Sequence, residues 1–257
     1  MTRTLVPGLS RTAAVHVVDT VTSICNRALE WRAYHNLRAS GLTELDDIRQ
    51  RACRGTDIAD HLETLFVETL LARPRLVVEL GVRGGESTFA LERAANLVEA
   101  RLVGVDLTDC RESSEWQRWI FVQADDIEFG CQFRDWALRE ELPNEIDILF
   151  IDTSHEFGHT RRELATWLPL LSRSGKAILH DTNLKPLSRR REGGFIRGWD
   201  NARGVIRAVE DLLDANLSEG RAFTEVHGDW LVRHVPYSHG LTILDALGSR
   251  NGTIRTT

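Results

Sequence analysis

The sequence predicts an α/β fold in which a doubly wound, mostly parallel sheet carries helices on both faces. Short apolar runs at 76–80, 146–152 and 176–181 are typical of strands that are buried on both faces. Amphipathic stretches between them, with apolar residues three or four positions apart, indicate helices. Because strands and helices alternate, we expect parallel βαβ units. A helical extension is expected before this sheet and an antiparallel strand pair after it.

The remaining elements follow from the same patterns. Helices are expected at 12–39, from Thr43, and at 57–72, where Pro74 ends the helical part. Further strands are expected at 101–106 and 119–125, further helices at 89–100, 133–142, 159–171 and 201–214, and a strand pair with a Gly-Asp turn at 223–235. Residues 182–200 follow a strand without periodicity, which predicts a lid loop. We expect one domain over 1–257, with a helical extension at 1–73 and a ligand-binding core at 74–235.

Composition excludes several classes of protein. With 257 residues of which 42% are hydrophobic, the chain is not a disordered one. Its formal net charge of −6 argues against a nucleic-acid partner, because nucleic-acid binders carry a basic face. No apolar run of about 18 residues and no signal peptide are present, so we expect no membrane partner and a cytoplasmic location. The cysteines, which lack a C-x-x-C pair, are expected to be reduced: Cys25, Cys53, Cys110 and Cys131.

The first motif is a glycine-rich turn directly after the strand at 76–80. Glycines there let the backbone approach a ligand, and the following helix offers free N–H groups to an anionic group. The spacing is not the G-x-G-x-x-G of dinucleotide sites, and an acidic residue ends the strand. A carboxylate would repel a pyrophosphate but suits the ammonium of S-adenosylmethionine. The candidate cofactor-binding residues are Glu79, Gly81, Arg83, Gly85 and Ser87.

The next two strands also end in acidic residues. Asp106 lies at the end of the second strand, where a carboxylate can accept both hydroxyls of a ribose. Asp125 and Asp126 follow the third strand and could reach the adenine amino group. The alternative for these two residues is capping of the next helix, which Asp favours.

The fourth and fifth strands end in a group of Asp and His residues. Asp152 and Asp181 should meet at one edge of the sheet, since neighbouring parallel strands end there. Asp152 is a candidate for the cofactor as well as for a divalent cation, and His180, Asp181 and Asn183 are the other candidate metal ligands. His155 follows three residues after Asp152, and its imidazole suits a general base.

Basic residues of the predicted lid are candidates for the acceptor. Arg190, Arg191 and Arg197 could clamp a phosphate, and a solvated basic loop is the alternative. His16, His35, His61 and His159 are interpreted as structural, because they lie in helical stretches. Trp31 and Tyr34 lie in the helical extension, for which we expect a role in homo-oligomerisation.

From about 60 to 235 the chain resembles the class I S-adenosylmethionine-dependent methyltransferases, and most of all the metal-dependent sugar O-methyltransferases of antibiotic biosynthesis. The matching motifs are E-L-G-V-R-G-G at 79–85, V-D at 105–106, Q-A-D at 123–125, F-I-D-x-x-H at 150–155, W-L-P-L-L-x-x-x-G at 167–175 and H-D-T at 180–182. The resemblance implies a Rossmann-like methyltransferase fold, with Asp152 and Asp181 binding Mg²⁺ or another divalent cation and His155 as the base.

The sequence departs from that family at two positions. Arg83 replaces the middle glycine of the cofactor turn, a change that the subfamily tolerates. His180 stands where several members have an acidic ligand, and this departure leaves the metal open. The cation could be weakly bound, completed by Asn183, or absent. The implied reaction is methyl transfer to a sugar hydroxyl, such as the 3-hydroxyl of a dTDP-linked rhamnose, in antibiotic biosynthesis.

Several alternatives remain. The acceptor could be a small molecule of another kind, a finished glycoside or an aromatic hydroxyl. A non-catalytic S-adenosylmethionine-binding protein would not need His155. A nicotinamide-dependent enzyme is disfavoured by the missing G-x-G-x-x-G, and a metal hydrolase by the missing H-E-x-x-H.

Overall fold

A computed structural model describes Ser23 and residues 26–248. Within the expected first helix, residues 26–35 are helical, while Cys25, His16 and all of 12–22 lie outside the described residues. Trp31 and Tyr34 are 66% and 49% exposed on this helix. The chain then continues through α2 (Thr43–Ala52), the short helix η1 (Ala59–His61) and α3 (Leu62–Ala72).

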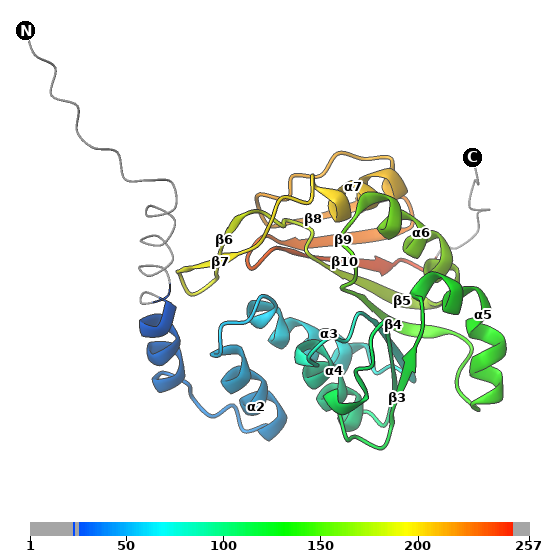
Figure 1. Ribbon diagram of the computed structural model, residues 1–257, viewed down its shortest axis with the longest axis horizontal. Helices are drawn as coiled ribbons and strands as arrows, with labels where there is room; N and C mark the ends of the chain where they lie inside the picture. The colour runs from blue at the N-terminus through cyan, green and yellow to red at the C-terminus, as the bar shows by residue number, and fades with distance from the viewer. Residues whose placement is uncertain (1–22, 24–25, 249–257) are drawn as a thin grey trace, which may run out of the picture.

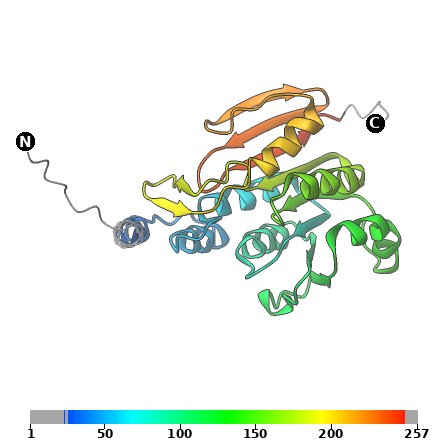
Figure 2. The ribbon, with the colours of Figure 1, turned by 45° about the horizontal axis from the view of Figure 1, so that its top comes forward.

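One mixed sheet of eight strands forms the centre of the molecule (Figures 1 and 2). Its order is β3-β2-β1-β4-β5-β10-β9-β8. The parallel part consists of β1 (Leu76–Leu80), β2 (Arg101–Asp106), β3 (Trp119–Gln123), β4 (Ile146–Ile151) and β5 (Leu171–His180). The antiparallel part consists of β8 (Phe223–His227), β9 (Trp230–Val235) and β10 (Leu241–Ala246). The predicted doubly wound sheet with an antiparallel C-terminal addition is confirmed.

Helices cover both faces of the sheet. One face carries α2, α3 and α4 (Glu86–Leu97), and the other carries α5 (Asp126–Arg139), α6 (Phe157–Trp167) and α7 (Gly204–Leu213). Successive strand residues point to opposite faces, so that Val78 packs in the core with α5 and α6 while Val77 packs with α3 and α4. Burial on both faces explains the continuous apolar runs.

The structure corrects three boundaries. Residues 182–200 contain an antiparallel hairpin, β6 (Leu187–Arg189) and β7 (Phe195–Arg197), where the sequence predicted an irregular loop. The helix expected at 159–171 ends at Trp167, because the short helix η3 (Leu168–Leu170) contains Pro169 and β5 begins at Leu171. Gly175 therefore lies inside a strand, where a Cβ would come within 2.9 Å of the Ile146 carbonyl oxygen.

The third antiparallel strand, β10, was missed by the sequence analysis. It lies between β5 and β9 and extends the sheet past residue 235 to Ala246. Its six residues, LTILDA, are too short for periodicity to distinguish a strand from a helix turn. Its position depends on pairing with segments far away in the sequence.

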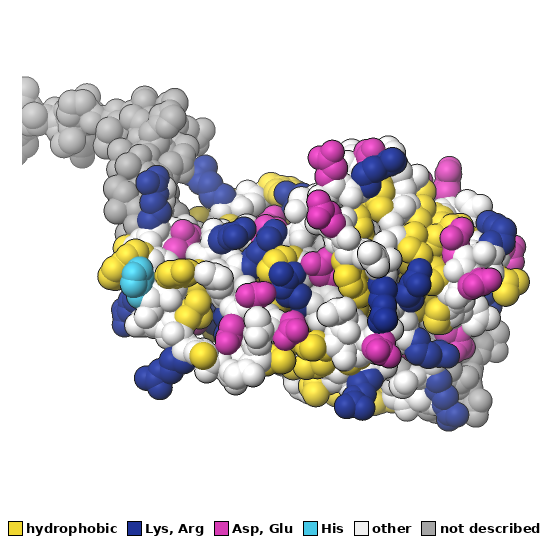
Figure 3. Space-filling view, turned by 90° about the horizontal axis from the view of Figure 1, so that it is seen from below, with side chains coloured by type: hydrophobic (Ala, Val, Ile, Leu, Met, Phe, Trp, Pro, Cys, Tyr) yellow, Lys and Arg dark blue, Asp and Glu magenta, His cyan; other side chains and the backbone are white. Residues whose placement is uncertain are grey.

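Surface and cysteine features complete the description. None of the helices within the described ranges is long and apolar enough to cross a membrane. Cys53, Cys110 and Cys131 are free thiols, as expected. On the face shown in Figure 3, Lys and Arg side chains lie between Asp and Glu side chains and do not gather by sign.

Candidate active site at the carboxyl edge of the sheet

The glycine turn joins β1 to α4 and closes the edge of the sheet. Gly81 has a φ of +87°, and a Cβ there would come within 2.1 Å of the Asp152 carbonyl oxygen. Its N–H donates to the Val105 carbonyl at 2.9 Å. Gly81 thus lets the ends of β1, β2 and β4 approach one another. A Cβ at Gly84 would meet no atom within 4 Å, so the turn is open to a ligand on that side.

Arg83 takes a left-handed conformation in this turn, with a φ of +48°. Its guanidinium lies 3.2 Å from Asp57, a residue that the sequence analysis did not single out. Gly85 has a φ of +74°, and a Cβ there would come within 2.9 Å of Ser113. The departure from the family pattern at Arg83 is therefore accommodated by backbone strain and an ion pair.

Glu79 is fully buried and faces α4. The hydroxyls of Ser87 and Thr88 donate to its two oxygens at 2.5 and 2.7 Å. Burial raises the pKa of Glu79 to about 8, against the effect of these two hydrogen bonds. In this geometry Glu79 anchors the start of α4, and a direct contact with the ammonium of a cofactor stays a prediction.

Asp106 also stabilises the turn. One of its oxygens accepts from the N–H groups of Val82 and Arg83, at 2.9 and 3.0 Å. The other accepts from the N–H and hydroxyl of Thr108, both at 2.8 Å. Burial raises the pKa of Asp106, but these hydrogen bonds outweigh it and the net shift is downward. All of its lone pairs are engaged, so binding a ribose would require an exchange of partners.

The two acids after β3 have separate positions. Asp125 is the N-cap of α5 and accepts from the Glu128 N–H at 2.9 Å, which is the capping alternative. Asp126 is buried and faces α6, where its carboxylate lies 3.1 Å from His159 Nε2. Neither geometry tests an adenine contact, which stays a prediction for both residues.

His155 lies between the carboxylates that end β4 and β5. Its Nε2 lies 3.1 Å from Asp181 Oδ2, and its Nδ1 lies 3.9 Å from Asp152 Oδ1. The ring packs against Trp199 with centroids 5.5 Å apart. His155 and Asp181 both have left-handed backbones, with φ of +60° and +58°. Such strain is often found at functional sites.

His180 has a different environment from the one predicted. Its Nε2 faces the Ser238 carbonyl oxygen at 3.2 Å, and its Nδ1 faces Asp152 at 3.2 Å and Asp181 at 3.5 Å. Burial lowers the pKa of His180, but the two carboxylates outweigh it and raise the pKa to about 10. A protonated imidazole has no lone pair for a cation. The ring of His61, interpreted as structural, packs on His180 at 5.5 Å.

The residues fit a cation, although in a different set from the predicted one. Ligand atoms of Asp152, His155 and Asp181 lie within 4.8 Å of one another, and Asp181 Oδ1 is buried without a hydrogen-bond partner. Burial raises the pKa of Asp181, whereas burial of Asp152 is outweighed by His180, which lowers its pKa. Asn183 donates to the Pro236 carbonyl oxygen at 2.8 Å, while its own oxygen is buried without a partner. These orphaned oxygens are available to a ligand.

Sequence reasoning missed a second cluster nearby, made of Asp126, His159 and Glu163. Thr153 donates to Glu163 at 2.6 Å. Burial and the neighbouring Asp126 carboxylate raise the pKa of Glu163 well above its usual range. The i, i+4 spacing of His159 and Glu163 on one helix face was the signal that could have found it.

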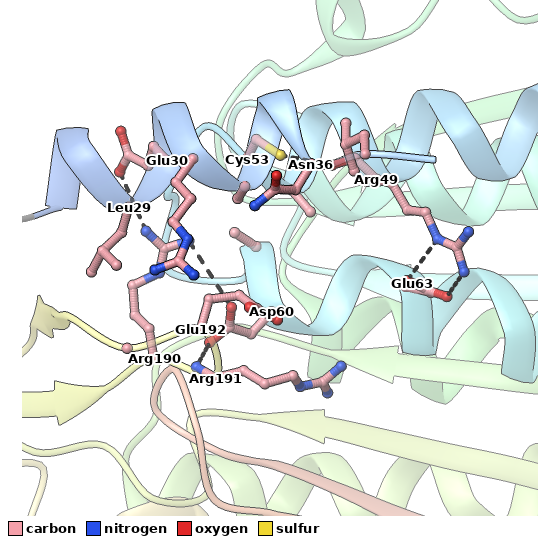
Figure 4. A pocket seen from close by; sticks show the side chains of 16 residues that line it. Leu29, Glu30, Asn36, Arg49, Cys53, Asp60, Glu63, Arg190, Arg191 and Glu192 are labelled. Atoms are coloured by element: carbon pink, nitrogen blue, oxygen red, sulfur yellow. Dashed lines mark hydrogen bonds and ion pairs between the residues drawn. The ribbon is translucent and has the colours of Figure 1, made fainter. Parts of the chain in front are cut away.

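Two of the predicted clamp arginines, Arg190 and Arg191, line a cavity of about 500 Å³ between the helix at 26–35, α2 and the β6–β7 hairpin (Figure 4). Arg190 is 6% exposed, and its guanidinium lies 3.3 Å from Glu30 and 4.0 Å from Asp60. The backbone N–H of Arg191 donates to Asp60 at 2.7 Å. Arg197 lines a separate hollow beside the same helix. Only Arg190 and Arg191 are therefore brought together.

The comparisons with known proteins agree with this architecture. Residues 78–182, from β1 to the end of the fifth-strand motif, match a family model described as a methyltransferase domain. This match confirms the predicted class of enzyme and covers the glycine turn and every acidic strand end described above. A sequence search of curated proteins finds no match.

Solved structures share the fold. A methyltransferase from Geobacter sulfurreducens is 18% identical, with a TM-score of 0.51 over 83% of this chain and 93% of that one. MycE from mycinamycin biosynthesis, with Mg and SAH, is 17% identical with a TM-score of 0.51; the match covers 83% of this chain but only 57% of MycE. The O-methyltransferase TomG from Streptomyces achromogenes, with SAM, is 14% identical with a TM-score of 0.51, over 85% and 96% of the two chains. At such identities the likeness establishes the Rossmann-like methyltransferase fold alone.

Proposed function

We propose that this protein transfers a methyl group from S-adenosylmethionine to a sugar hydroxyl. The observation that carries the proposal is His155, which lies against Asp181 at the carboxyl edge of a methyltransferase sheet, beside the glycine turn. S-adenosylmethionine supplies the electrophilic methyl group when bound. The protein then has to orient a hydroxyl, exclude water and accept one proton.

The contact between His155 and Asp181 favours one nitrogen as the atom that accepts the proton. Nε2 lies 3.1 Å from Asp181 Oδ2, so the carboxylate favours the neutral ring with its proton on Nε2 and its lone pair on Nδ1. Asp181 holds this tautomer and stabilises the imidazolium that forms on proton transfer. The arrangement follows the logic of a general base oriented by a carboxylate.

A divalent cation fits the same residues and competes with this role. Asp152, Asp181 and His155 would hold it, and it would lower the pKa of the acceptor hydroxyl. A neutral His155 that binds a cation through Nε2 carries its proton on Nδ1 and cannot be the base. Catalysis with EDTA present therefore favours His155 as the base, and strict dependence on Mg²⁺ favours the cation.

The acceptor is proposed from the sequence resemblance. Within the sugar O-methyltransferases, the chain resembles the calicheamicin-pathway enzyme that methylates the 3-hydroxyl of a dTDP-linked rhamnose. Arg191 is the candidate for its diphosphate, because the charge of Arg190 is already compensated by Glu30 and Asp60. A finished glycoside or an aromatic hydroxyl is the alternative acceptor. Homo-oligomerisation through the N-terminal helices stays a prediction.

Mass spectrometry of a reaction with S-adenosylmethionine and dTDP-rhamnose tests the proposal, with Mg²⁺ in one sample and EDTA in another. We expect a sugar nucleotide heavier by one methyl group, and its loss in His155→Ala with cofactor affinity retained. Product from His155→Ala at the wild-type rate would contradict the role of this residue. If dTDP-rhamnose gives no product but glycosides or phenols do, only the choice of acceptor is overturned. Cofactor binding with no product from any of these would favour a non-catalytic binding protein.

A further inference from the structure

The second cluster has the geometry of a metal site. Asp126 is the first residue of α5, and His159 and Glu163 lie one turn apart on α6. His159 Nε2 lies 3.1 Å from Asp126 Oδ2 and 3.7 Å from Glu163 Oε1. Metal–ligand bonds of about 2.1 Å at tetrahedral or octahedral angles place ligand atoms about 3.0–3.5 Å apart. The three side chains need only a small adjustment to meet one ion.

Burial and charge give an independent reason for a ligand. Glu163 is completely buried, and its Oε2 has no hydrogen-bond partner. Asp126 is 7% exposed, and among the described residues no Arg or Lys pairs with either carboxylate. Two buried carboxylates that share one imidazole and have no Arg or Lys partner are unfavourable when both are charged. A positive charge between them would remove this penalty.

We propose that Asp126, His159 and Glu163 bind a divalent transition-metal ion at a site separate from the Asp152–His155–Asp181 cluster. One imidazole and two carboxylates suit Zn²⁺, Mn²⁺ or Co²⁺ better than Mg²⁺, which prefers oxygen ligands alone. The His159 side chain is 18% exposed, which gives the ion a path from solvent. The ion would join the first turn of α5 to α6.

The surrounding residues support this site. The Thr153 hydroxyl donates to Glu163 Oε1 at 2.6 Å and orients the carboxylate. The indole N–H of Trp167 donates to the Asp126 carbonyl oxygen at 3.1 Å and fixes the start of α5. Both ligand-bearing segments are therefore held in place by contacts of their own, as a preorganised site requires.

The site is tested by titrating metal-free protein with Co²⁺. Calorimetry and the visible absorption of Co²⁺ report the binding. Asp181→Asn serves as the background, because it removes a ligand of the other cluster. We expect this variant to bind one Co²⁺. The double variants Asp181→Asn/Glu163→Gln and Asp181→Asn/His159→Gln should bind Co²⁺ at least about ten-fold more weakly. Asp181→Asn/Asp135→Asn, altered elsewhere on α5, is the matched control and should bind as the background does.

Two results would overturn the proposal. The first is an Asp181→Asn protein that is folded by circular dichroism and binds no Co²⁺. The second is unchanged Co²⁺ binding when Glu163 or His159 is replaced. Neither result depends on methyl transfer, so the proposed function can fail while this site stands, and the reverse.

Discussion

Two charge clusters of different kinds lie along β5. Near the middle of the strand, Lys176 lies 2.7 Å from Glu68 and 2.9 Å from Asp245. Arg233 on β9 lies 2.6 Å from Glu68 and 2.7 Å from Asp245, so two cations meet two carboxylates. At the carboxyl end of β5, His180 and Asp181 meet Asp152 and His155, with one carboxylate oxygen left without a hydrogen-bond partner.

Under the proposed function, this difference separates residues that stabilise the fold from residues that take part in the reaction. In the cluster around Lys176, each carboxylate is paired with both cations. Together the four residues join α3, β5, β9 and β10. The cluster around Asp181 instead places its carboxylates against imidazole rings, with no Lys or Arg pairing with Asp152 or Asp181 among the described residues. Its strained backbone and orphaned oxygen are retained in spite of their energetic penalty, as is common at functional sites.

The largest effect is expected from Asp181→Asn. The amide no longer holds the Nε2–H tautomer of His155 and no longer binds a cation as a carboxylate does. We expect kcat to fall by about 10²–10⁴-fold, the usual contribution of a positioned base. Steady-state kinetics with mass-spectrometric detection of product measures it.

Asp245→Asn is the matched control, since it changes the same residue type in the cluster around Lys176. Its activity should remain within about two-fold of wild type at temperatures below the melting transition, because structural charges of that cluster do not touch the reacting atoms. An equal loss of kcat in both variants would show that the two clusters are not functionally distinct.

The next largest effect is expected on stability, from Glu68→Gln. Glu68 is 8% exposed and accepts hydrogen bonds from Arg233 and Lys176. Removing its charge leaves two cations with Asp245 alone, and breaking a buried ion pair lowers the free energy of unfolding by about 2–4 kcal/mol. Urea denaturation measures this change. A variant as stable as wild type but with impaired catalysis would reverse the assignment of the two clusters.

The position of the Asp181 cluster could be predicted from the sequence, whereas the Lys176 cluster could not. The alternation of strands and helices predicted a doubly wound parallel sheet, so that the ends of the fourth and fifth strands, with Asp152, His155 and Asp181, were expected at one edge. Strand ends can be placed from sequence because parallel βαβ units allow few topologies. The pairing of Lys176 with Glu68 could not be predicted, because the two residues are far apart in the chain and show no periodicity.

Side-chain partners were the main limit of the sequence analysis. Asp106 and Asp125 were assigned to a cofactor from their positions, and the structure shows them bonded to local backbone N–H groups. His180 was predicted to bind a metal, although its nitrogens face Ser238 and the carboxylates. A position at a strand end fixes where a side chain begins, while its partners depend on residues that folding brings together.

Glu79 predicts a pH dependence of stability. Its pKa in the folded protein, about 8, lies above the 4.5 of a solvated glutamate, so between these two pH values the native state holds a proton that the unfolded state has released. The contribution of Glu79 to the free energy of unfolding is therefore fully present below pH 4.5 and is lost as the pH rises toward 8. Between pH 6 and 7 we expect a fall of about 1 kcal/mol that Glu79→Gln abolishes. Urea denaturation across this range measures it, and parallel curves for the two proteins would contradict the shift.

The smallest effect is expected at Asp125, where it separates capping from recognition of the cofactor. Asp125→Ala removes the acceptor for the Glu128 N–H and should lower stability by about 1 kcal/mol. Asp125→Ser keeps a capping oxygen but removes the carboxylate, so stability should return. If the carboxylate also contacts adenine, the affinity for S-adenosylmethionine, measured by calorimetry, stays reduced in the Ser variant. Restored affinity together with restored stability would show that Asp125 acts on the cofactor only by holding the start of α5.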